Sequence, residues 1–416
     1  MNLQGPRAFA GVMTACLLLV TSFFSPAATM EISASFTPSA TNPENSAFTN
    51  TTPLSGYCVT WPQYCPAGVW GIALPLELRL KKPIVANDVP RNNPYFGLSN
   101  KSRSIPVVNQ TTGETSQVTF RVSGFSATYE SVADNTSWVG GTFMWPNAPC
   151  QFGGASVGNS YHYTFLWTVT SADGACYKIS TVDRTEPSRF YDMSIAYELE
   201  TPDPLKMSSG VYTGTAPLTI GPGGNIDFGD VYEASDTMLN INFTLTVTHE
   251  LKLTPAAGAQ TVALQPCPAG KICSEDEGEA NWERWMISRV TPQLTGRSAF
   301  TLSSSGGFTV FLDCAEHVGN ECALTSDNSG QQVPMRVAIN LPDNVIDTQT
   351  GSTVTGRPLL IGKSEGQNYF SAKTYGADKP GSIDFLVRQK DVDTMLATRP
   401  DTYRGAVTVI FDPNIY

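Results

Sequence analysis

The chain has 416 residues, a formal net charge of −11 and 15% charged residues, well below the roughly 25% of an average soluble protein. Its negative charge disfavours contact with phosphate backbones, so we do not expect a nucleic-acid-binding protein. Its length predicts two or three domains, and the missing charges are replaced by Thr, Ser, Asn and Gly, which favours exposed β-strands and loops over exposed helices.

The N-terminal segment has the organisation of a secretory signal peptide. Arg7 supplies a positive charge, residues 12–24 are almost wholly apolar, and Ser25-Pro26-Ala27 places small residues where a signal peptidase reads. We expect residues 1–28 to be a signal peptide and the chain to be exported. An uncleaved anchor is the alternative, but the apolar run is short for a bilayer, and no later stretch reaches about 18 apolar residues.

Eight cysteines follow the predicted signal peptide, and their even number in an exported chain predicts disulfide bonds. They are Cys58, Cys65, Cys150, Cys176, Cys267, Cys273, Cys314 and Cys322. Eight cysteines permit 105 connectivities, of which the pairing of sequence neighbours is the simplest. The spacings match no zinc motif, so we expect neither a metal site nor a cofactor.

Strand patterns dominate the remainder of the chain. Alternating β-branched and aromatic residues predict strands at Gln117–Ser123, Tyr163–Thr170, Leu239–Thr248 and Ala406–Phe411. Glycine and proline separate such segments throughout. The best helical candidate, Glu277–Ser288, is expected to form one or two turns at most, next to an acidic loop. The pattern predicts an all-β protein of the β-sandwich class.

One main domain boundary is indicated near Thr248, before a segment rich in small residues. We expect residues 29–248 to form one large sandwich and residues 249–416 to form a sandwich of immunoglobulin size with insertions. Ile32, Ala34 and Phe36 alternate with polar residues just after the signal peptide. This pattern fits an internal first strand, which we favour, and also a strand donated to a neighbouring molecule.

No catalytic constellation stands out. Residues 154–158 fit G-x-S-x-G, but in a glycine-rich loop of a β protein they lack the strand–turn–helix elbow that makes this serine reactive. His249-Glu250 is not followed by the second histidine of a zinc protease. Carboxylates are numerous, yet nothing points to a glycosidase pair. The chain is therefore predicted not to be an enzyme.

Tryptophans are the candidate ligand-binding residues, because carbohydrate sites place aromatic faces beside polar groups. Trp61, Trp138 and Trp145 lie in or near loops of the first predicted domain. Core packing is favoured for each of them, because tryptophan is highly buried on average.

Three segments carry a resemblance to a known family. The ending Tyr403–Phe411 (YRGAVTVIF) resembles the last strand of subunits assembled by the chaperone–usher pathway. Residues Phe48–Cys58 resemble the opening of a family of large fimbrial adhesins, and a third match runs from Tyr197 to Lys252. The layout is similar to two-domain tip adhesins, in which an adhesin domain precedes a pilin domain. Some of those adhesins carry a basic cluster after the strand matching Gly210–Ile220, and this chain has no arginine there.

The resemblance implies an immunoglobulin-like pilin domain that lacks one strand. A periplasmic chaperone would fill the resulting groove first, an outer-membrane usher would follow, and a donor strand of the neighbouring pilin subunit would then replace the chaperone strand. The residues implied to border the groove are Tyr403, Gly405, Val407, Val409 and Phe411.

The expected function is therefore that of a fimbrial adhesin on the surface of a Gram-negative cell. It would attach the cell to a host or environmental surface, with a glycan as one candidate receptor. A structural minor pilin without a receptor, or a secreted carbohydrate-binding protein or enzyme, remains the alternative. Surface binding by the first domain would separate the adhesin from the minor pilin.

Overall fold

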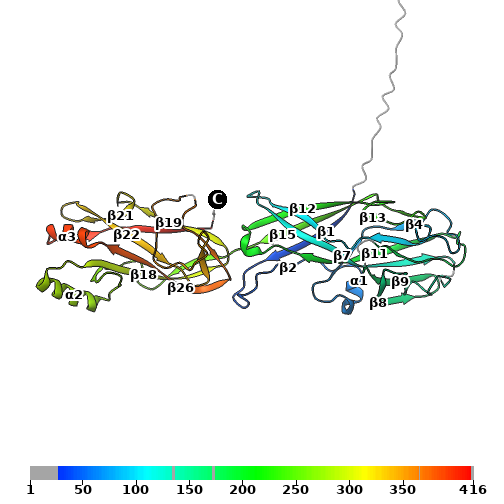
Figure 1. Ribbon diagram of the computed structural model, residues 1–416, viewed down its shortest axis with the longest axis horizontal. Coiled ribbons are helices and arrows are strands. Elements are labelled where there is room, and N and C mark those ends of the chain that lie inside the picture. The colour runs from blue at the N-terminus through cyan, green and yellow to red at the C-terminus, as the bar shows by residue number, and fades with distance from the viewer. Residues whose placement is uncertain (1–26, 134–135, 171–173, 365, 414–416) are drawn as a thin grey trace, which may run out of the picture.

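The computed structural model describes residues 27–416 except 134–135, 171–173, 365 and 414–416. Most of the predicted signal peptide, residues 1–26, lies outside the described residues. The described chain forms two sheet-rich halves arranged end to end, residues 28–247 and residues 251–412 (Figure 1). The predicted all-β class is confirmed. The predicted ranges 29–248 and 249–416 stay predictions.

The first half contains fifteen strands and short helical turns among its described residues. The strands are β1 (Ala28–Phe36), β2 (Thr49–Asn50), β3 (Trp70–Ala73), β4 (Leu78–Leu80), β5 (Tyr95–Leu98), β6 (Arg103–Asn109), β7 (Thr115–Ser131), β8 (Gln151–Gly158), β9 (His162–Thr168), β10 (Cys176–Tyr177), β11 (Ser188–Glu200), β12 (Gly210–Thr219), β13 (Ile226–Asp227), β14 (Tyr232–Ala234) and β15 (Met238–Val247). The helical turns are α1 (Tyr57–Thr60), η1 (Pro62–Tyr64), η2 (Pro90–Asn92) and η3 (Pro204–Lys206).

One large sheet runs through this half in the order β14-β4-β11-β7-β6-β12-β15-β1-β2, and the hairpin β8–β9 joins it at β7. A small sheet, β10-β5-β13, packs with it around an aromatic core. Phe96 lies at the centre of that core, 4.6 Å from Phe125 and 5.0 Å from Phe190 between ring centroids. The predicted strands near residues 117, 163 and 239 correspond to β7, β9 and β15.

Strand β1 is an internal strand of the large sheet, as favoured from the sequence. It pairs in parallel with β15, from Ala28 opposite Leu239 to Phe36 opposite Val247. Its alternating residues Ile32, Ala34 and Phe36 are all buried in the core, because successive side chains of a strand point to opposite faces.

The second half contains thirteen strands and two helices among its described residues. They are β16 (Leu251–Pro255), β17 (Gln265–Cys267), α2 (Glu275–Ser288), β18 (Gln293–Ser304), β19 (Gly307–Cys314), β20 (His317–Val318), β21 (Glu321–Ser326), β22 (Gln332–Asn340), β23 (Val345–Asp347), β24 (Arg357–Pro358), β25 (Tyr369–Ala372), β26 (Gly376–Val387), α3 (Gln389–Ala397), β27 (Tyr403–Arg404) and β28 (Val407–Asp412). They form two sheets, β16-β18-β26-β22-β21-β20 and β23-β25-β19-β28, with one apolar core between them.

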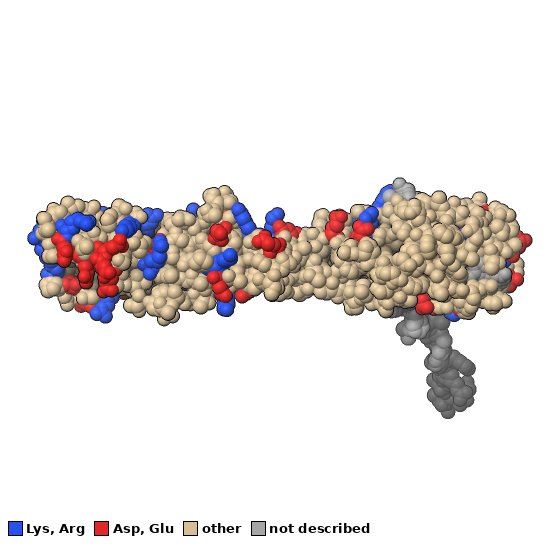
Figure 2. Space-filling view, turned by 90° about the horizontal axis from the view of Figure 1, so that it is seen from below, with Lys and Arg blue, Asp and Glu red and all other residues tan. Residues whose placement is uncertain are grey.

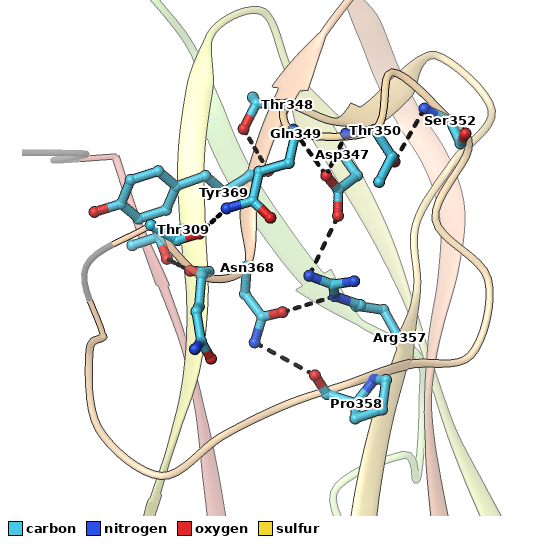
Figure 3. A network of polar contacts seen from close by, with 12 residues as sticks. Thr309, Asp347, Thr348, Gln349, Thr350, Ser352, Arg357, Pro358, Asn368 and Tyr369 are labelled. Carbon is cyan, nitrogen blue, oxygen red and sulfur yellow. Dashed lines mark hydrogen bonds and ion pairs between the residues drawn. The ribbon is translucent and has the colours of Figure 1, made fainter.

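A polar network ties the long connection between β23 and β25 to the second sheet (Figure 3). Buried Asp347 accepts backbone hydrogen bonds from Gln349 and Thr350 and forms an ion pair with Arg357 at 3.5 Å. Arg357 donates in turn to Asn368 at 3.1 Å. The network fixes the loop on the side of β19 opposite β28.

The helix prediction was wrong in length. Helix α2 spans 14 residues rather than one or two turns, and it begins inside the stretch expected to be an acidic loop. The reason is a capping box, in which the Ser274 side chain accepts from the Glu277 backbone and the Glu277 side chain accepts from the Ser274 backbone. Three acidic residues in the first turn also suit the positive end of the helix dipole. Helix α3 was not predicted.

The described cysteines form four disulfides between sequence neighbours: Cys58–Cys65, Cys150–Cys176, Cys267–Cys273 and Cys314–Cys322. Among the described residues, no helix is long and apolar enough to cross a membrane, and no group of three or more His, Cys, Asp and Glu side chains is placed to hold a metal ion.

The two halves meet through few contacts around His249. Its imidazole lies 5.9 Å from the Phe36 ring, and its Nε2 is 2.8 Å from the Met207 carbonyl oxygen. Tyr375 of the second half donates its backbone N–H to the Pro43 carbonyl of the first half. Burial lowers the pKa of His249, so the imidazole at this junction is neutral near pH 7.

We expect Ile32→Ala to lower the free energy of unfolding of the first half by about 2–4 kcal/mol, because it leaves a cavity in the core. Ser35→Ala, on the opposite face of the same strand, is the matched control and should change it by less than about 0.5 kcal/mol. Urea unfolding followed by tryptophan fluorescence is the measurement, since five of the seven tryptophans lie before residue 168. Equal stability of both variants would contradict an internal β1.

Removing the Cys150–Cys176 bridge should destabilise the chain more than removing the Cys267–Cys273 bridge. The bridges join residues 26 and 6 apart, and loop-closure entropy gives about 3.5 and about 2 kcal/mol respectively. Double alanine variants compared by thermal unfolding test this order. A larger loss from the shorter loop would show that packing around the bridge, and not chain entropy, decides.

Candidate functional site

A groove of about 790 Å³ lies beside the C-terminal strand of the second half. Its floor is made of core residues from four strands: Leu294, Leu324, Met335 and Phe385. These side chains belong to the space between the two sheets. Leu294, Leu324 and Met335 are buried and Phe385 is half-buried, so the groove lies directly beside the core of the second half.

One wall of the groove is β28 with the residues before it. Strand β28 pairs with β19 along one edge, from Cys314 opposite Val407 to Thr309 opposite Asp412. No described strand pairs with its other edge, so backbone N–H and C=O groups there lack a ladder partner. Val407, Val409 and Phe411 pack on the core yet remain only half-buried.

The opposite wall is the segment 260–264, which connects β16 to β17. β16 and β17 both pair with β18, but the residues between them leave that ladder. Leu264 from this segment and Trp282 from α2 are half-buried against the core. The groove lies between this segment and β28, and no strand of the described residues occupies it.

The predicted terminal strand is divided in two, which corrects the expectation of one continuous strand. Residues Tyr403–Arg404 form β27 on β21, and residues Val407–Asp412 form β28 on β19. The change of sheet occurs at Gly405, where a Cβ would lie 2.5 Å from the Ala323 carbonyl oxygen. Tyr403, Gly405 and Val407 line the groove, whereas Val409 and Phe411 continue along the same edge strand.

The far end of the second half, around α2 and α3, carries many charges of both signs (Figure 2). Arg399 and Asp401 line this end of the groove, and the Arg399 guanidinium lies 5.7 Å from the Trp285 ring. The groove thus combines an apolar floor with a charged end.

The three candidate tryptophans do not form one site. Trp138 is 3% exposed and packs against Phe143, so its ring cannot be offered to a ligand in this fold. Trp145 is 52% exposed and stands beside Phe152. Trp61 is half-buried and lines a cleft on the flank of the first half.

Sequence reasoning missed Lys178, which holds the loop that carries Trp145. Its side chain is fully buried, and Nζ donates to the carbonyl oxygens of Val139 and Trp145 at 2.7 and 2.5 Å. Burial lowers its pKa to about 8, since the ammonium group has lost its hydration. No sequence pattern around Lys178 predicts a buried cation.

A polar cleft of about 830 Å³ lies where β4, β7, β9 and β11 begin or end. Arg189 donates two hydrogen bonds to Glu130, at 3.2 and 3.0 Å, and keeps the pKa of that carboxyl below its ordinary value. His162, Arg79 and the exposed Tyr161 complete the lining. Arg189 is paired with Glu130, and Arg79 lies 3.3 Å from Glu77, so both arginines of this distal cleft have an acidic partner.

The G-x-S-x-G segment lies in strand β8, not in the expected loop. Ser156 pairs with Phe165 of β9, and its hydroxyl is 3.3 Å from the Tyr163 hydroxyl. The turn into a helix that would expose a nucleophile is not formed there.

Comparison with known proteins gives solved structures only, since no family model and no curated protein matches. The chain is similar to CfaE, the adhesive subunit of the CFA/I fimbria of enterotoxigenic Escherichia coli, with 8% identity, a TM-score of 0.22 and 92% of each chain covered. A chaperone–tip adhesin complex of CFA/I fimbriae gives 8% identity, a TM-score of 0.24, and 93% and 97% coverage of this chain and that chain.

The third likeness is to the CsuC–CsuE chaperone–tip adhesion subunit complex from the archaic chaperone–usher Csu pili of Acinetobacter baumannii. It has 13% identity and a TM-score of 0.21, and it covers 93% of this chain and 98% of that chain.

Gly405→Ala should lower the free energy of unfolding of the second half by about 1–3 kcal/mol, because the added Cβ would overlap the Ala323 carbonyl. Ala406→Ser is the control, since residue 406 is exposed and already carries a Cβ. Differential scanning calorimetry of both variants tests the expectation. An unchanged melting temperature for Gly405→Ala would mean that β27 is not held against β21.

Proposed function

We propose that this chain is the terminal subunit of a chaperone–usher fimbria and that it attaches the cell to a surface. The observation that carries the proposal is the unpaired edge of β28 beside an open apolar groove. An extended segment with alternating apolar side chains would satisfy both features at once. Its backbone would pair with β28, and its side chains would cover Leu294, Leu324 and Phe385.

The chaperone and a neighbouring subunit are the proposed donors of that segment, in succession. Each would stabilise the second half by closing its core, because a ligand that binds only the folded state shifts the unfolding equilibrium. An uncovered groove of this kind is an aggregation hazard, which favours delivery by a dedicated partner. Transport through the periplasm and an outer-membrane usher to the cell surface follows from this assembly route.

The terminal position is supported by β1. A subunit inside a fibre must donate a strand as well as accept one, but β1 is paired along nine residues with β15 and buries Ile32, Ala34 and Phe36. Withdrawing it would expose the core of the first half. The chain therefore accepts a strand without donating β1, which leaves the first half at the free end for contact with a receptor.

The test uses the full mature chain and a synthetic peptide of about 12 residues with alternating apolar side chains. The expected result is a rise in the melting temperature of the second half, amounting to about 2.7 kcal/mol of stabilisation at 100 times the dissociation constant. A peptide of identical composition with the alternation broken should have no effect. Its apolar side chains would point to both faces of the strand, and part of them would not face the groove.

The position of the added strand is tested by two lysine substitutions on β28. Val409→Lys points into the core side of the strand and should abolish the peptide effect, whereas Thr408→Lys, on the exposed side opposite Asp313, should preserve it. Amide hydrogen exchange of residues 407–411 should slow only when the alternating peptide is bound. Indifference of the wild-type chain to every peptide would contradict the fimbrial proposal.

A further inference from the structure

A lateral cleft of about 390 Å³ lies on the flank of the first half, between α1 and the outer face of the sheet. In Figure 1, α1 lies beside β8, β9 and β11, and η1 contacts β8 directly. The cleft is distinct from the distal cleft and from the groove of the second half, with which it shares no lining residue.

The floor of the lateral cleft is a row of small side chains across three strands. Thr128 of β7 is opposite Thr164 of β9, which is opposite Val157 of β8. The two threonine hydroxyls are 2.8 Å apart and hydrogen-bonded to each other. Val157 is 60% exposed. The floor therefore offers hydroxyl groups and one apolar surface to a ligand.

One wall is Trp61, which is held in place by its surroundings. It lies inside the loop closed by the Cys58–Cys65 disulfide, and its backbone N–H donates to the Tyr57 carbonyl at 2.7 Å. Gly56 allows this loop to approach the sheet, since φ is 66° and a Cβ would lie 2.2 Å from the Ser194 Cβ. Trp61 is thus a partly exposed aromatic side chain on a fixed support.

The other wall is Asp192, which a β-bulge turns outward. Between Tyr191 opposite Thr128 and Ser194 opposite Ser126, β11 has two residues where β7 has one. Asp192 has a left-handed φ of 47° and is exposed. Its carboxylate makes no hydrogen bond or ion pair with any residue that the structure describes. It is the only charged side chain in the lining of this cleft.

We propose that the lateral cleft binds a neutral glycan residue. The apolar face of a pyranose ring would lie on Trp61, and the Asp192 carboxylate would accept hydrogen bonds from two neighbouring hydroxyls. The hydroxyls of Thr60, Thr128 and Thr164 would supply further contacts.

The glycan is inferred to be neutral because Asp192 would repel a carboxylate or sulfate. The face of the first half seen in Figure 2, the side on which α1 lies, carries few charged side chains. The distal cleft differs, because its lining holds Arg79 and Arg189 together with Glu130. The two clefts therefore differ in the charged side chains that they present to a sugar, and substitutions of those side chains can distinguish them.

The inference rests on the proposed receptor-binding role of the first half. It is tested with the full mature chain, its groove filled by the alternating peptide, on an array that prints neutral oligosaccharides beside their sialylated counterparts. The expected result is binding to neutral members only. Binding confined to sialylated members, or to none, would overturn the proposal.

Two substitutions in the cleft should each weaken binding to the neutral oligosaccharides at least tenfold. Asp192→Asn keeps a residue that tolerates a left-handed φ and removes only the charge. Trp61→Ala removes the ring, and Trp61→Phe should restore part of the affinity. Melting temperatures within about 2 °C of the wild type would show that the fold of the first half is retained.

The matched control is Arg189→Ala in the distal cleft, which should leave binding to neutral oligosaccharides unchanged. Loss of binding in Arg189→Ala but not in Asp192→Asn would place the ligand in the distal cleft and overturn the proposal. Stabilisation by the alternating peptide is measured on the same variants. A peptide effect without glycan binding rejects the lateral site alone, whereas no peptide effect rejects the fimbrial proposal.

Discussion

The unpaired edge of β28 is the constraint on which the arrangement of the second half depends. A sandwich needs every edge of its apolar interior covered, yet the edge strand β28 has one free side and the floor beside it is made of core leucine, methionine and phenylalanine. In the proposed assembly, this open edge would allow attachment to another chain through main-chain hydrogen bonds.

The first half covers the edge of its core with a strand of its own. Here β1 supplies the strand that covers the core, and it lies parallel to β15 instead of forming a hairpin with it. Strand β1 is thereby part of the folded sheet of the first half. The first half therefore covers its core with its own strand β1, whereas strand β28 of the second half keeps one unpaired edge. The two halves thus differ in whether the last strand beside the core comes from the same half.

The sequence predicted the strands well where a single face is buried, because period-two alternation reports that arrangement directly. It predicted β7, β9 and β15, and the edge role of Val407, Val409 and Phe411 stays a prediction that the groove geometry supports. It did not predict the length of α2, because the acidic residues that form its first turn are also typical of a loop. Only the hydrogen bonds of the capping box distinguish the two. Trp138 is buried, as core packing predicted for it.

The sites themselves were less predictable, for a physical reason. Both clefts of the first half combine residues that are distant in sequence, such as Arg79 with Glu130 and Trp61 with Asp192. Only the sheet register brings them together. The bulge that exposes Asp192 arises from one extra residue in β11, and no local pattern marks it.

The end-to-end arrangement of the two halves has a mechanical consequence. Strand β15 leads through three residues into β16, so in the proposed fimbria, tension between a bound surface and the fibre would enter the first half along the axis of β15. Its hydrogen bonds to β1 and β12 lie across that axis over nine and ten residue pairs. They are therefore loaded together in shear rather than one after another, the geometry in which a sheet resists rupture best.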